Sequence, residues 1–321
     1  PLIDLLSHIP DSVLKKRGIE KNIMHLISLE EQQELLLALT AEKLAVEFAA
    51  GGSGANSMIG IAQLGGRTAF SGKIGRDEHG KIYREKLEDL GVSACLAEGE
   101  GSTGSSLVLV SDDGCRTMNT YLGMSQELQA PDIDPEVIEA SKYLYLTGYL
   151  WDTDSQKKAV RTSLDVAKRV ETKVALSLSD PFCVTRHKED FKSLLQGYVS
   201  MVFSNQEEAF TLLDTNVTQE AVDIMSKWTE TVVLTLGANG AIISHLGQTY
   251  YIDPLPIRVE DTTGAGDAFA AGFLFGMTHD FSPLESGRIG AALAGAVIEQ
   301  TGSRFQGHAH SLINEKLGIR L

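Results

Sequence analysis

Short apolar runs alternate with longer amphipathic segments along most of this 321-residue chain. A short apolar run is typical of a buried strand, and an apolar position at every third or fourth residue is typical of a helix that covers a sheet. Their alternation predicts an α/β fold, in which helices cover both faces of a mostly parallel sheet. The predicted strands are Thr68–Ile74, Tyr143–Leu146, Val174–Leu178, Tyr198–Phe203 and Val232–Leu236, and the main helices are Leu29–Leu44, Glu78–Leu90, Ser155–Val170, Gln206–Leu213, Gln219–Lys227, Ala268–Met277 and Pro283–Gln300.

Two pairs of segments predict antiparallel strands instead. Ser106–Ser111 and Thr117–Leu122, joined by the turn Asp112–Cys115, predict a β-hairpin. Because its alternating pattern differs from the continuous apolar strands, we expect this hairpin in a separate, exposed sheet. The second pair is Ala241–Ser244 with Thr249–Ile252. No composition break separates a C-terminal domain, so a second domain is expected as an insertion of strands.

The first residues, Pro1–Leu6, have the pattern of the second half of a buried strand, with no initiator methionine. We therefore expect the natural chain to begin upstream and this strand to be truncated, which the intact mass of the native protein would test. Asp4 lies within the same apolar run, and a carboxylate buried without partners is costly. Its partners are expected to be either substrate hydroxyls or backbone amides.

The formal net charge of −15 argues against a nucleic-acid partner, because phosphate contacts require clustered Lys and Arg. Cys95, Cys115 and Cys183 lack metal-type spacing and cannot all pair, which favours a reducing compartment. No apolar run is as long as a membrane span, and no secretory leader is evident. We therefore expect a cytoplasmic protein without a membrane partner.

The stretch Asp261–Phe269 reads as a strand end, a glycine turn and the start of a helix. Gly264 and Gly266 allow backbone angles and a close approach that a Cβ would block. The first amides of the helix lack internal partners, so they suit a phosphate or a developing oxyanion. Asp267 beside them is placed to act as a general base, or it is simply an acidic residue favoured in a first helical turn.

A second glycine turn, Gly51–Ser57, also opens a helix, which is expected to continue to Leu64. Its glycines permit a ligand to approach the backbone, and Asn56 offers both a donor and an acceptor to a polyhydroxylated substrate. The structural alternative is that Ser53 or Asn56 caps the helix. The third glycine of a dinucleotide-binding fingerprint is missing, which argues against an NAD site.

Two further patterns follow strand ends. Asn205 and Glu208 are three residues apart at a strand-to-helix junction and could hold hydrated Mg²⁺, although spacing alone favours a helix-capping box. The turn Thr235–Gly240 ends another apolar strand, where open α/β sheets bind ligands, although a plain hairpin turn explains its glycines equally well. Arg116 in the hairpin is more typical of a solvated charge than of a ligand.

Together these motifs resemble the ribokinase-like PfkB family of carbohydrate and nucleoside kinases. The resemblance rests on Asp261–Phe269 with Gly272, on Gly51–Asn56 continued by Gly65-Gly66 and Gly75–Gly80, on Asn205–Glu208, and on Thr235-Leu236-Gly237. It implies a three-layer α/β/α fold with a central, mostly parallel sheet. It also implies a small β-sheet lid formed by strands from about residues 11–50 and 103–123.

Within the family the chain is most similar to the adenosine kinases. This closer resemblance rests on Pro1–Asp4, Thr103–Ser106, Tyr145–Leu150 and Ser177–Phe182. Met24 stands where a Gln is expected, and the aromatic pair after Gly148 is Tyr149-Leu150. Because both positions would border the base, a nucleoside and a sugar both stay open as the acceptor.

The resemblance implies an ATP-dependent kinase, with Mg²⁺ and a monovalent cation near Asp261 and Thr263, that phosphorylates a primary hydroxyl such as the 5′-OH of adenosine. Asp267 would be the base. The implied roles are phosphoryl stabilisation by Gly264, Ala265 and Gly266, nucleotide binding by Asn205, Thr235, Gly237, Gly240 and Thr263, Mg²⁺ binding through water by Asn205 and Glu208, and substrate binding by Asp4, Gly52, Ser53, Asn56 and, from the lid, Arg116.

The kinase interpretation has three alternatives. The first is a sugar kinase for ribose, fructose or a related ketose. The second is a catalytically silent ligand-binding protein, which the complete Gly264–Asp267 motif argues against. The third, an NAD-dependent oxidoreductase, fails on the missing fingerprint. Both a monomer and a homodimer are compatible with the resemblance.

Overall fold

The computed structural model describes residues 1–21, 23–112 and 115–320, and it divides into two compact units. The first unit comprises Pro1–Ala55 and Phe70–Leu128. The second unit comprises Asn56–Ala69 and the chain from Gln129 onward. The division falls inside the helix that follows the first glycine turn, so that Asn56 belongs to the same unit as the C-terminal half.

A six-stranded sheet forms the centre of the second unit, in the order β13-β12-β11-β10-β9-β8. The strands β8 to β11 run parallel, and β12 and β13 pair antiparallel, as predicted. The bounds of the strands are β8 (Tyr143–Thr147), β9 (Lys173–Ser177), β10 (Met201–Asn205), β11 (Thr231–Thr235), β12 (Ala241–His245) and β13 (Gln248–Ile252).

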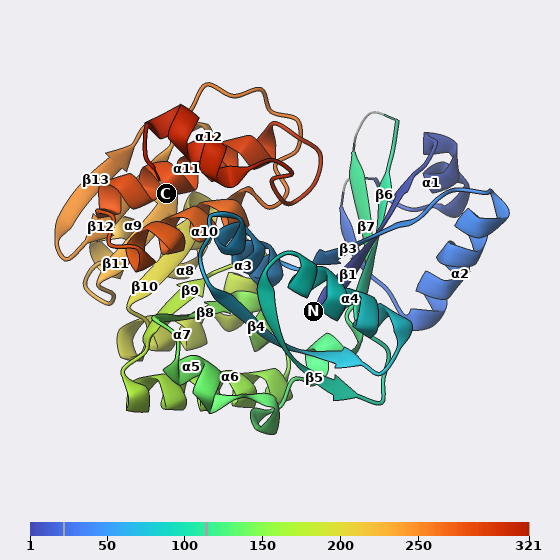
Figure 1. Cartoon of the computed structure of the whole chain (residues 1–321), viewed down its shortest axis with the longest axis horizontal. Helices are drawn as coiled ribbons and strands as arrows, with labels where there is room; N and C mark the ends of the chain where they lie inside the picture. Colours follow the sequence, from blue (N-terminus) through green and yellow to red (C-terminus); the bar gives the residue numbers. More distant parts are fainter. Residues whose placement is uncertain (22, 113–114, 321) are drawn as a thin grey trace. The chain divides into compact units, whose positions relative to one another are not determined.

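Successive residues of these strands point to opposite faces of the sheet. Val232 and Leu234 of β11 belong to one hydrophobic core, and Val233 belongs to the other. Helices therefore cover both faces, which confirms the three-layer α/β/α fold (Figure 1). The first core contains α5 (Pro135–Glu139), α6 (Asp154–Val170), α7 (Pro181–Gly197), α8 (Gln206–Leu213) and α9 (Thr218–Met225); the second contains α3 (Ser53–Gln63), α10 (Ala265–Thr278), α11 (Pro283–Ile298) and α12 (Ala309–Leu317).

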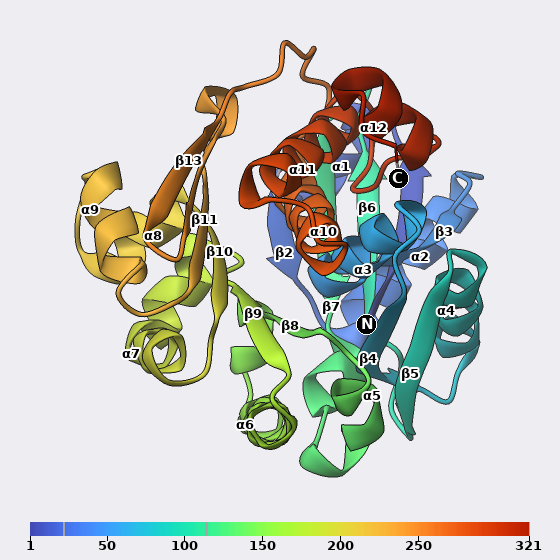
Figure 2. The ribbon, with the colours of Figure 1, turned by 60° about the vertical axis from the view of Figure 1, so that its left-hand side comes forward.

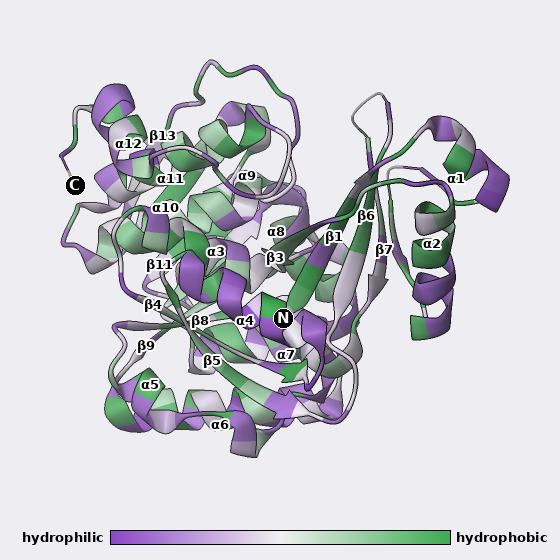
Figure 3. Ribbon diagram, turned by 45° about the vertical axis from the view of Figure 1, so that its right-hand side comes forward, coloured by the Kyte–Doolittle hydropathy of each residue, from purple (hydrophilic) through white to green (hydrophobic). Residues whose placement is uncertain are grey.

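Hydropathy follows this layering. Strand β11 is buried along almost its whole length, whereas α6 contains both hydrophobic and hydrophilic residues (Figure 3). A strand buried between two helical layers needs apolar side chains on both faces, while an outer helix needs them on one. This explains why the central strands read as continuous apolar runs in the sequence.

Helices α10 and α11 pack with their backbones close together. An added Cβ on Gly272 of α10 would lie 2.7 Å from the Cα of Gly290 on α11. A Cβ on Gly276 would overlap Ser286 in the same way. Both helices are almost entirely buried at this contact. Gly272, part of the motif that follows Asp267, is therefore required by packing.

We expect Gly272→Ala to destabilise the second unit by about 1–3 kcal/mol, because the new methyl group must push two buried backbones apart. Urea unfolding followed by circular dichroism measures this change. Gly197→Ala is the matched control, since no described atom lies within 4 Å of a Cβ built at Gly197. Equal stability of the two variants would show that the α10–α11 contact tolerates a wider separation.

The first unit contains a five-stranded sheet in the order β2-β7-β6-β1-β3. β6 and β7 form the predicted hairpin, and β1 pairs parallel with β6 and antiparallel with β3. A separate pair of strands, β4 and β5, is flanked by α4. The bounds are β1 (Leu2–His8), α1 (Asp11–Arg17), β2 (Met24–Leu26), α2 (Leu29–Ala41), β3 (Glu47–Gly51), β4 (Thr68–Gly75), α4 (Glu78–Asp89), β5 (Val92–Gly99), β6 (Ser105–Val110) and β7 (Arg116–Tyr121).

The expectation that the hairpin lies in an exposed sheet is wrong for β6, whose residues are all buried. Its last four residues, Leu107–Val110, are a continuous apolar run. Ser105 and Ser106 are buried because their hydroxyls bond to Gln32 of α2 and to Thr120 of β7. The predicted turn between the strands includes residues 113 and 114, which lie outside the described residues.

Several elements are absent from the sequence prediction, namely α1, β2, β5, α5, α7 and α12. Strand β10 also begins only at Met201, because residues 198–200 connect it to α7. In the part of the chain that the structure describes, no helix has the length and apolarity required to cross a bilayer.

Candidate active site

The parallel strands of the second unit end at one edge of the sheet. Asn205, the last residue of β10, pairs in register with Thr235, the last residue of β11. Thr147 of β8 pairs in the same way with Ser177 of β9. Ligands of open α/β sheets bind beyond this carboxyl edge. The sequence-predicted residues Asn205 and Thr235 are thus brought together where a binding site is expected.

The glycine turn before α10 has the predicted geometry, but the prediction of a strand end at Asp261 is wrong, because the preceding strand, β13, ends at Ile252. Gly264 caps the helix with φ 78°, in the left-handed region. A Cβ there would also overlap the backbone carbonyl of Ser303, so two independent constraints require glycine. A Cβ on Gly266 would meet no described atom within 4 Å. The start of α10 therefore opens onto free space, as an anion-binding helix terminus requires.

Asp267 lies in the first turn of α10 and is held by α3. The side-chain amide of Asn56 donates to Asp267 Oδ2 over 3.0 Å, and the hydroxyl of Ser57 donates to the backbone carbonyl of Asp267 over 3.2 Å. Asn56 is 8% exposed and Ser57 is fully buried. Asn56 therefore orients the predicted base, a contact that neither substrate binding nor helix capping predicts.

Asp261 ties the turn to the loop that follows α11. Its Oδ1 accepts the amide of Thr263 over 2.9 Å, and its Oδ2 accepts the amide of Gly302 over 3.0 Å. The hydroxyl of Ser303 in the same loop lies 3.4 Å from Asn56 Oδ1. The amide of Ala265 donates to the carbonyl of Thr262 over 3.2 Å. The turn is thus fixed by its own hydrogen bonds, independently of any ligand.

Asn205 and Glu208 form a capping box at the start of α8. Asn205 Oδ1 accepts the amide of Glu208 over 2.8 Å, and the Asn205 amide donates to Glu208 Oε2 over 3.0 Å. Burial raises the pKa of Glu208 to about 7, opposed by the Asn205 hydrogen bond and assisted by the charges of Asp180 and Glu207. The helix-capping box is therefore present, and the predicted Mg²⁺ role would be additional to capping.

Several acidic groups face the same region. The pKa of Tyr149 is raised, first by burial of its hydroxyl and then by the negative charges of Asp180 and Asp267. Asp180 also acts on Glu208. Among the described residues, no three His, Cys, Asp or Glu side chains form a metal-ligand cluster.

The turn after β11 contains both predicted nucleotide-binding glycines, Gly237 and Gly240, and they have different surroundings. Gly240 has φ 83°, and a Cβ there would overlap the carbonyl of Ile252, so the turn itself requires it. Gly237 has φ 57°, and a Cβ there would meet no described atom within 4 Å. Thr235 Oγ1 donates to the carbonyl of Ser204 over 3.4 Å. Only Gly237 thus leaves open space for a ligand.

The remaining predicted substrate-binding residues, Asp4, Gly52, Ser53 and Arg116, belong to the first unit. The carboxylate of Asp4 lies directly beside Gly51, where a Cβ would overlap it. Their roles toward a substrate stay predictions.

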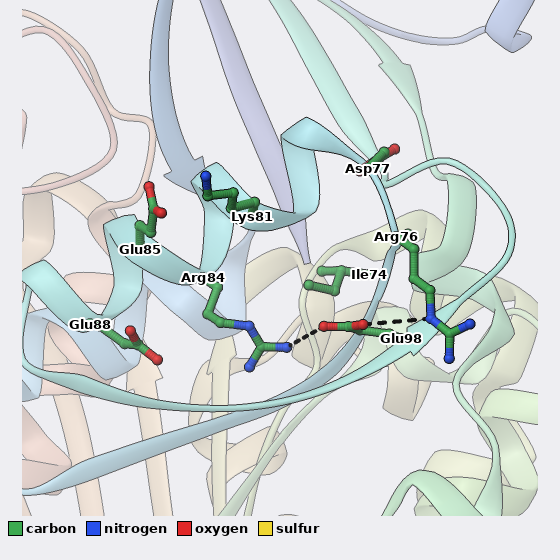
Figure 4. A pocket seen from close by; sticks show the side chains of 9 residues that line it. Ile74, Arg76, Asp77, Lys81, Arg84, Glu85, Glu88 and Glu98 are labelled. Carbon is green, nitrogen blue, oxygen red and sulfur yellow. Dashed lines mark hydrogen bonds and ion pairs between the residues drawn. The ribbon is translucent and has the colours of Figure 1, made fainter.

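The first unit also has a cavity of about 320 Å³ between β4, α4 and β5 (Figure 4). Arg84 and Arg76 on its wall both pair with Glu98, over 3.1 and 3.6 Å. Three basic residues and four acidic residues line the cavity, so it has no dominant sign of charge to recruit a charged ligand; they are Arg76, Lys81, Arg84, Asp77, Glu85, Glu88 and Glu98.

Sequence reasoning missed three residues near Asp267, namely Ser57, Tyr145 and Ser303. Ser57 follows Asn56 directly in the glycine-turn motif, and this position could have identified it as a residue near the site. Tyr145 lies in an apolar strand and reads as core. Ser303 comes close to Asn56 only through the fold, so no local pattern identifies it.

The chain is similar to known proteins over most of its length. The family model described as pfkB family carbohydrate kinase matches residues 20–308. The crystal structure of adenosine kinase from Sinorhizobium meliloti is 34% identical, with a TM-score of 0.86, and the alignment covers 98% of this chain and 96% of that one. A probable sugar kinase from Rhizobium etli is also 34% identical, with a TM-score of 0.87 and coverage of 98% and 95%. The 5-dehydro-2-deoxygluconokinase of Geobacillus kaustophilus is 29% identical, over 77% of this chain and 78% of the relative.

Proposed function

The chain belongs to the pfkB family of carbohydrate kinases, which are phosphotransferases with an alcohol group as acceptor, and we propose that it phosphorylates the 5′-hydroxyl of adenosine. Kinases of this family use ATP as the phosphoryl donor, generally with Mg²⁺. The observation that carries the proposal is a carboxylate, Asp267, held by Asn56 at the open start of α10. A base beside an anion-binding helix terminus is the pair of groups that phosphoryl transfer needs.

In the proposed reaction, the acceptor oxygen attacks the γ-phosphorus of ATP as the bond from that phosphorus to the ADP oxygen breaks. Asp267 takes the proton of the attacking hydroxyl. The amides of Gly264, Ala265 and Gly266 at the start of α10 stabilise the charge on the transferring group, and the Ala265 amide would share its proton between that group and the carbonyl of Thr262. Glu208 and Asn205 would hold Mg²⁺ through water, and the ion would supply positive charge beside the phosphates.

We further propose that Thr235, Gly237, Gly240, Thr263 and Asn205 bind the nucleotide at the carboxyl edge of the sheet. The five-stranded sheet of the first unit is proposed as a lid that excludes water during transfer. Asp4, Gly52, Ser53 and Asn56 would contact the acceptor, and Arg116 would contribute from the lid. We also propose that a monovalent cation binds near Asp261. The protein is proposed to be cytoplasmic and to be a monomer or a homodimer.

A sugar is the second candidate acceptor. Equal identities to the Sinorhizobium meliloti adenosine kinase and to the Rhizobium etli sugar kinase favour neither class. Met24, proposed to border the acceptor, is 53% exposed and offers no hydrogen-bond donor or strong acceptor to a nucleobase. This residue is the specific observation in favour of a sugar.

A coupled assay of ATP consumption over adenosine, other nucleosides, ribose, fructose and 5-dehydro-2-deoxygluconate distinguishes these candidates. We expect the highest kcat/KM with adenosine. Higher turnover of any sugar would replace adenosine as the acceptor and leave the kinase assignment intact. No ATP consumption with any acceptor would favour a silent binding protein of the same fold.

Asp267→Asn should lower kcat by about 10²–10⁴-fold, because the amide cannot accept the proton of the hydroxyl. The Kd of the acceptor should change little, since the side chain keeps its size. Steady-state kinetics and calorimetry measure the two quantities. Asp165→Asn on the exposed surface of α6 is the control and should retain full activity. A variant at position 267 with most of its turnover would remove Asp267 from the role of base.

Glu208→Gln tests the Mg²⁺ role and a pH effect together. Because the folded-state pKa of Glu208 is raised to about 7, its contribution to stability is present below the unfolded pKa of 4.5 and is lost as the pH rises through about 7. Gln removes this dependence, so the unfolding temperature should vary less between about pH 5 and 8. The Mg²⁺ concentration for half-maximal activity should also rise several-fold.

Glu315→Gln, at an exposed position of α12, is the control for both measurements. An unchanged Mg²⁺ titration in Glu208→Gln would leave Glu208 with the capping role alone.

A further inference from the structure

We propose that Ser57, supported by Tyr145, is a positioning pair that holds the first turn of α10 and thereby directs the Asp267 carboxylate toward the acceptor hydroxyl. The inference rests on the proposed role of Asp267 as the base. Neither residue is expected to touch the acceptor or the nucleotide.

Ser57 contacts the base through the main chain. Its Oγ lies 3.2 Å from the carbonyl oxygen of Asp267, while Asn56, the preceding residue, bonds to the carboxylate of the same Asp267 over 3.0 Å. Two consecutive residues of α3 thus hold one residue at both its side chain and its backbone. Restraint at two points fixes the direction of a carboxylate, whereas one hydrogen bond leaves it free to rotate about that contact.

The close approach of the two helices makes this contact possible. One turn after Ser57, Gly60 faces α10, and a Cβ added there would lie 2.7 Å from the Cβ of Ala271. Ala271 follows Asp267 by one helical turn. Helices α3 and α10 lie side by side in both ribbon views (Figures 1 and 2). The glycine contact therefore sets the separation at which the short Ser57 side chain reaches the α10 backbone.

Tyr145 is a second hydrogen-bond partner of the Ser57 hydroxyl. The two hydroxyl oxygens are 3.5 Å apart. A serine hydroxyl has one proton, so Ser57 can donate to Asp267 and keep the second contact only if Tyr145 donates to Ser57. Burial, together with the charge of Asp267, raises the pKa of Tyr145, which keeps its hydroxyl protonated and able to donate.

The Tyr145 ring is itself fixed to α10 by aromatic packing. It meets Phe203 of β10 edge-on with centroids 6.0 Å apart, and Phe203 meets Phe273 of α10 edge-on at 5.8 Å. Edge-to-face pairs of this kind have preferred geometries and resist rotation. The tyrosine hydroxyl is thus held by the same helix whose first turn it helps to position.

Ser57→Ala is expected to lower kcat about tenfold while the KM values for ATP and acceptor stay unchanged, because binding groups are untouched. Tyr145→Phe, which removes only the hydroxyl, should lower kcat by a smaller factor. Hydrogen exchange followed by mass spectrometry should show faster exchange of amides 264–268 in Ser57→Ala. This second readout needs no turnover, so it tests the positioning even if the kinase assignment fails.

Ser163→Ala is the matched control. Ser163 is 4% exposed and donates to the carbonyl of Ala159 over 3.0 Å, so its loss costs a similar buried hydrogen bond away from the site. It should leave kcat and the exchange of amides 264–268 unchanged. Wild-type kcat and exchange in Ser57→Ala would overturn the proposal, as would a loss equal to that of Ser163→Ala.

The double variant Ser57→Ala, Asp267→Asn separates action through the base from other effects. If Ser57 acts by directing Asp267, the double variant should be no slower than Asp267→Asn alone. Losses that multiply would show that Ser57 acts elsewhere, and the positioning proposal would fall while the assignment of Asp267 stands. Full turnover in Asp267→Asn alone would instead remove the base assignment.

Discussion

The close contact of three helices on one face of the sheet is the constraint on which the second unit depends. Gly60 of α3 lies against Ala271, and Gly272 of α10 lies against Gly290 of α11. Without side chains in the way, backbones approach to distances at which short polar groups meet. Asn56 and Ser57 then both bond directly to Asp267. Larger residues at the glycine contacts would separate these groups, so the geometry of the site depends on the packing of the helices.

The site combines features that oppose each other electrostatically. Carboxylates of Asp180, Glu208 and Asp267 act on the same neighbourhood, and burial raises the pKa of Glu208 to about 7. The start of α10 contributes partial positive charge from its first amides. A triphosphate alone would be repelled by the acids and attracted only by the helix. A cation bound to the phosphates would reduce their repulsion by the carboxylates, which agrees with the general use of Mg²⁺ in the family.

Much of this arrangement can be predicted from the sequence, because it depends on local pattern. The turn before Asp267, the capping box at Asn205 and the apolar strands are all readable in short windows. Helix α7 is not, since His187 has non-helical φ and ψ within it and interrupts the periodicity. The buried state of β6 depends on Gln32, far away in the chain. Likewise, the contact of Ser57 with Asp267 joins residues that no window contains together.

The bonds of Asp261 reach further than the glycine turn. Its carboxylate joins Thr263 to Gly302, and the carbonyl of the next residue, Ser303, occupies the space beside Gly264. The length of the loop between α11 and Ser303 is therefore constrained by its contacts with Asp261 and Gly264. An insertion or deletion in that loop would displace the Gly302 amide from Asp261 and the Ser303 carbonyl from Gly264. A surface loop usually tolerates changes in length, but this loop is constrained because it contacts the turn before Asp267.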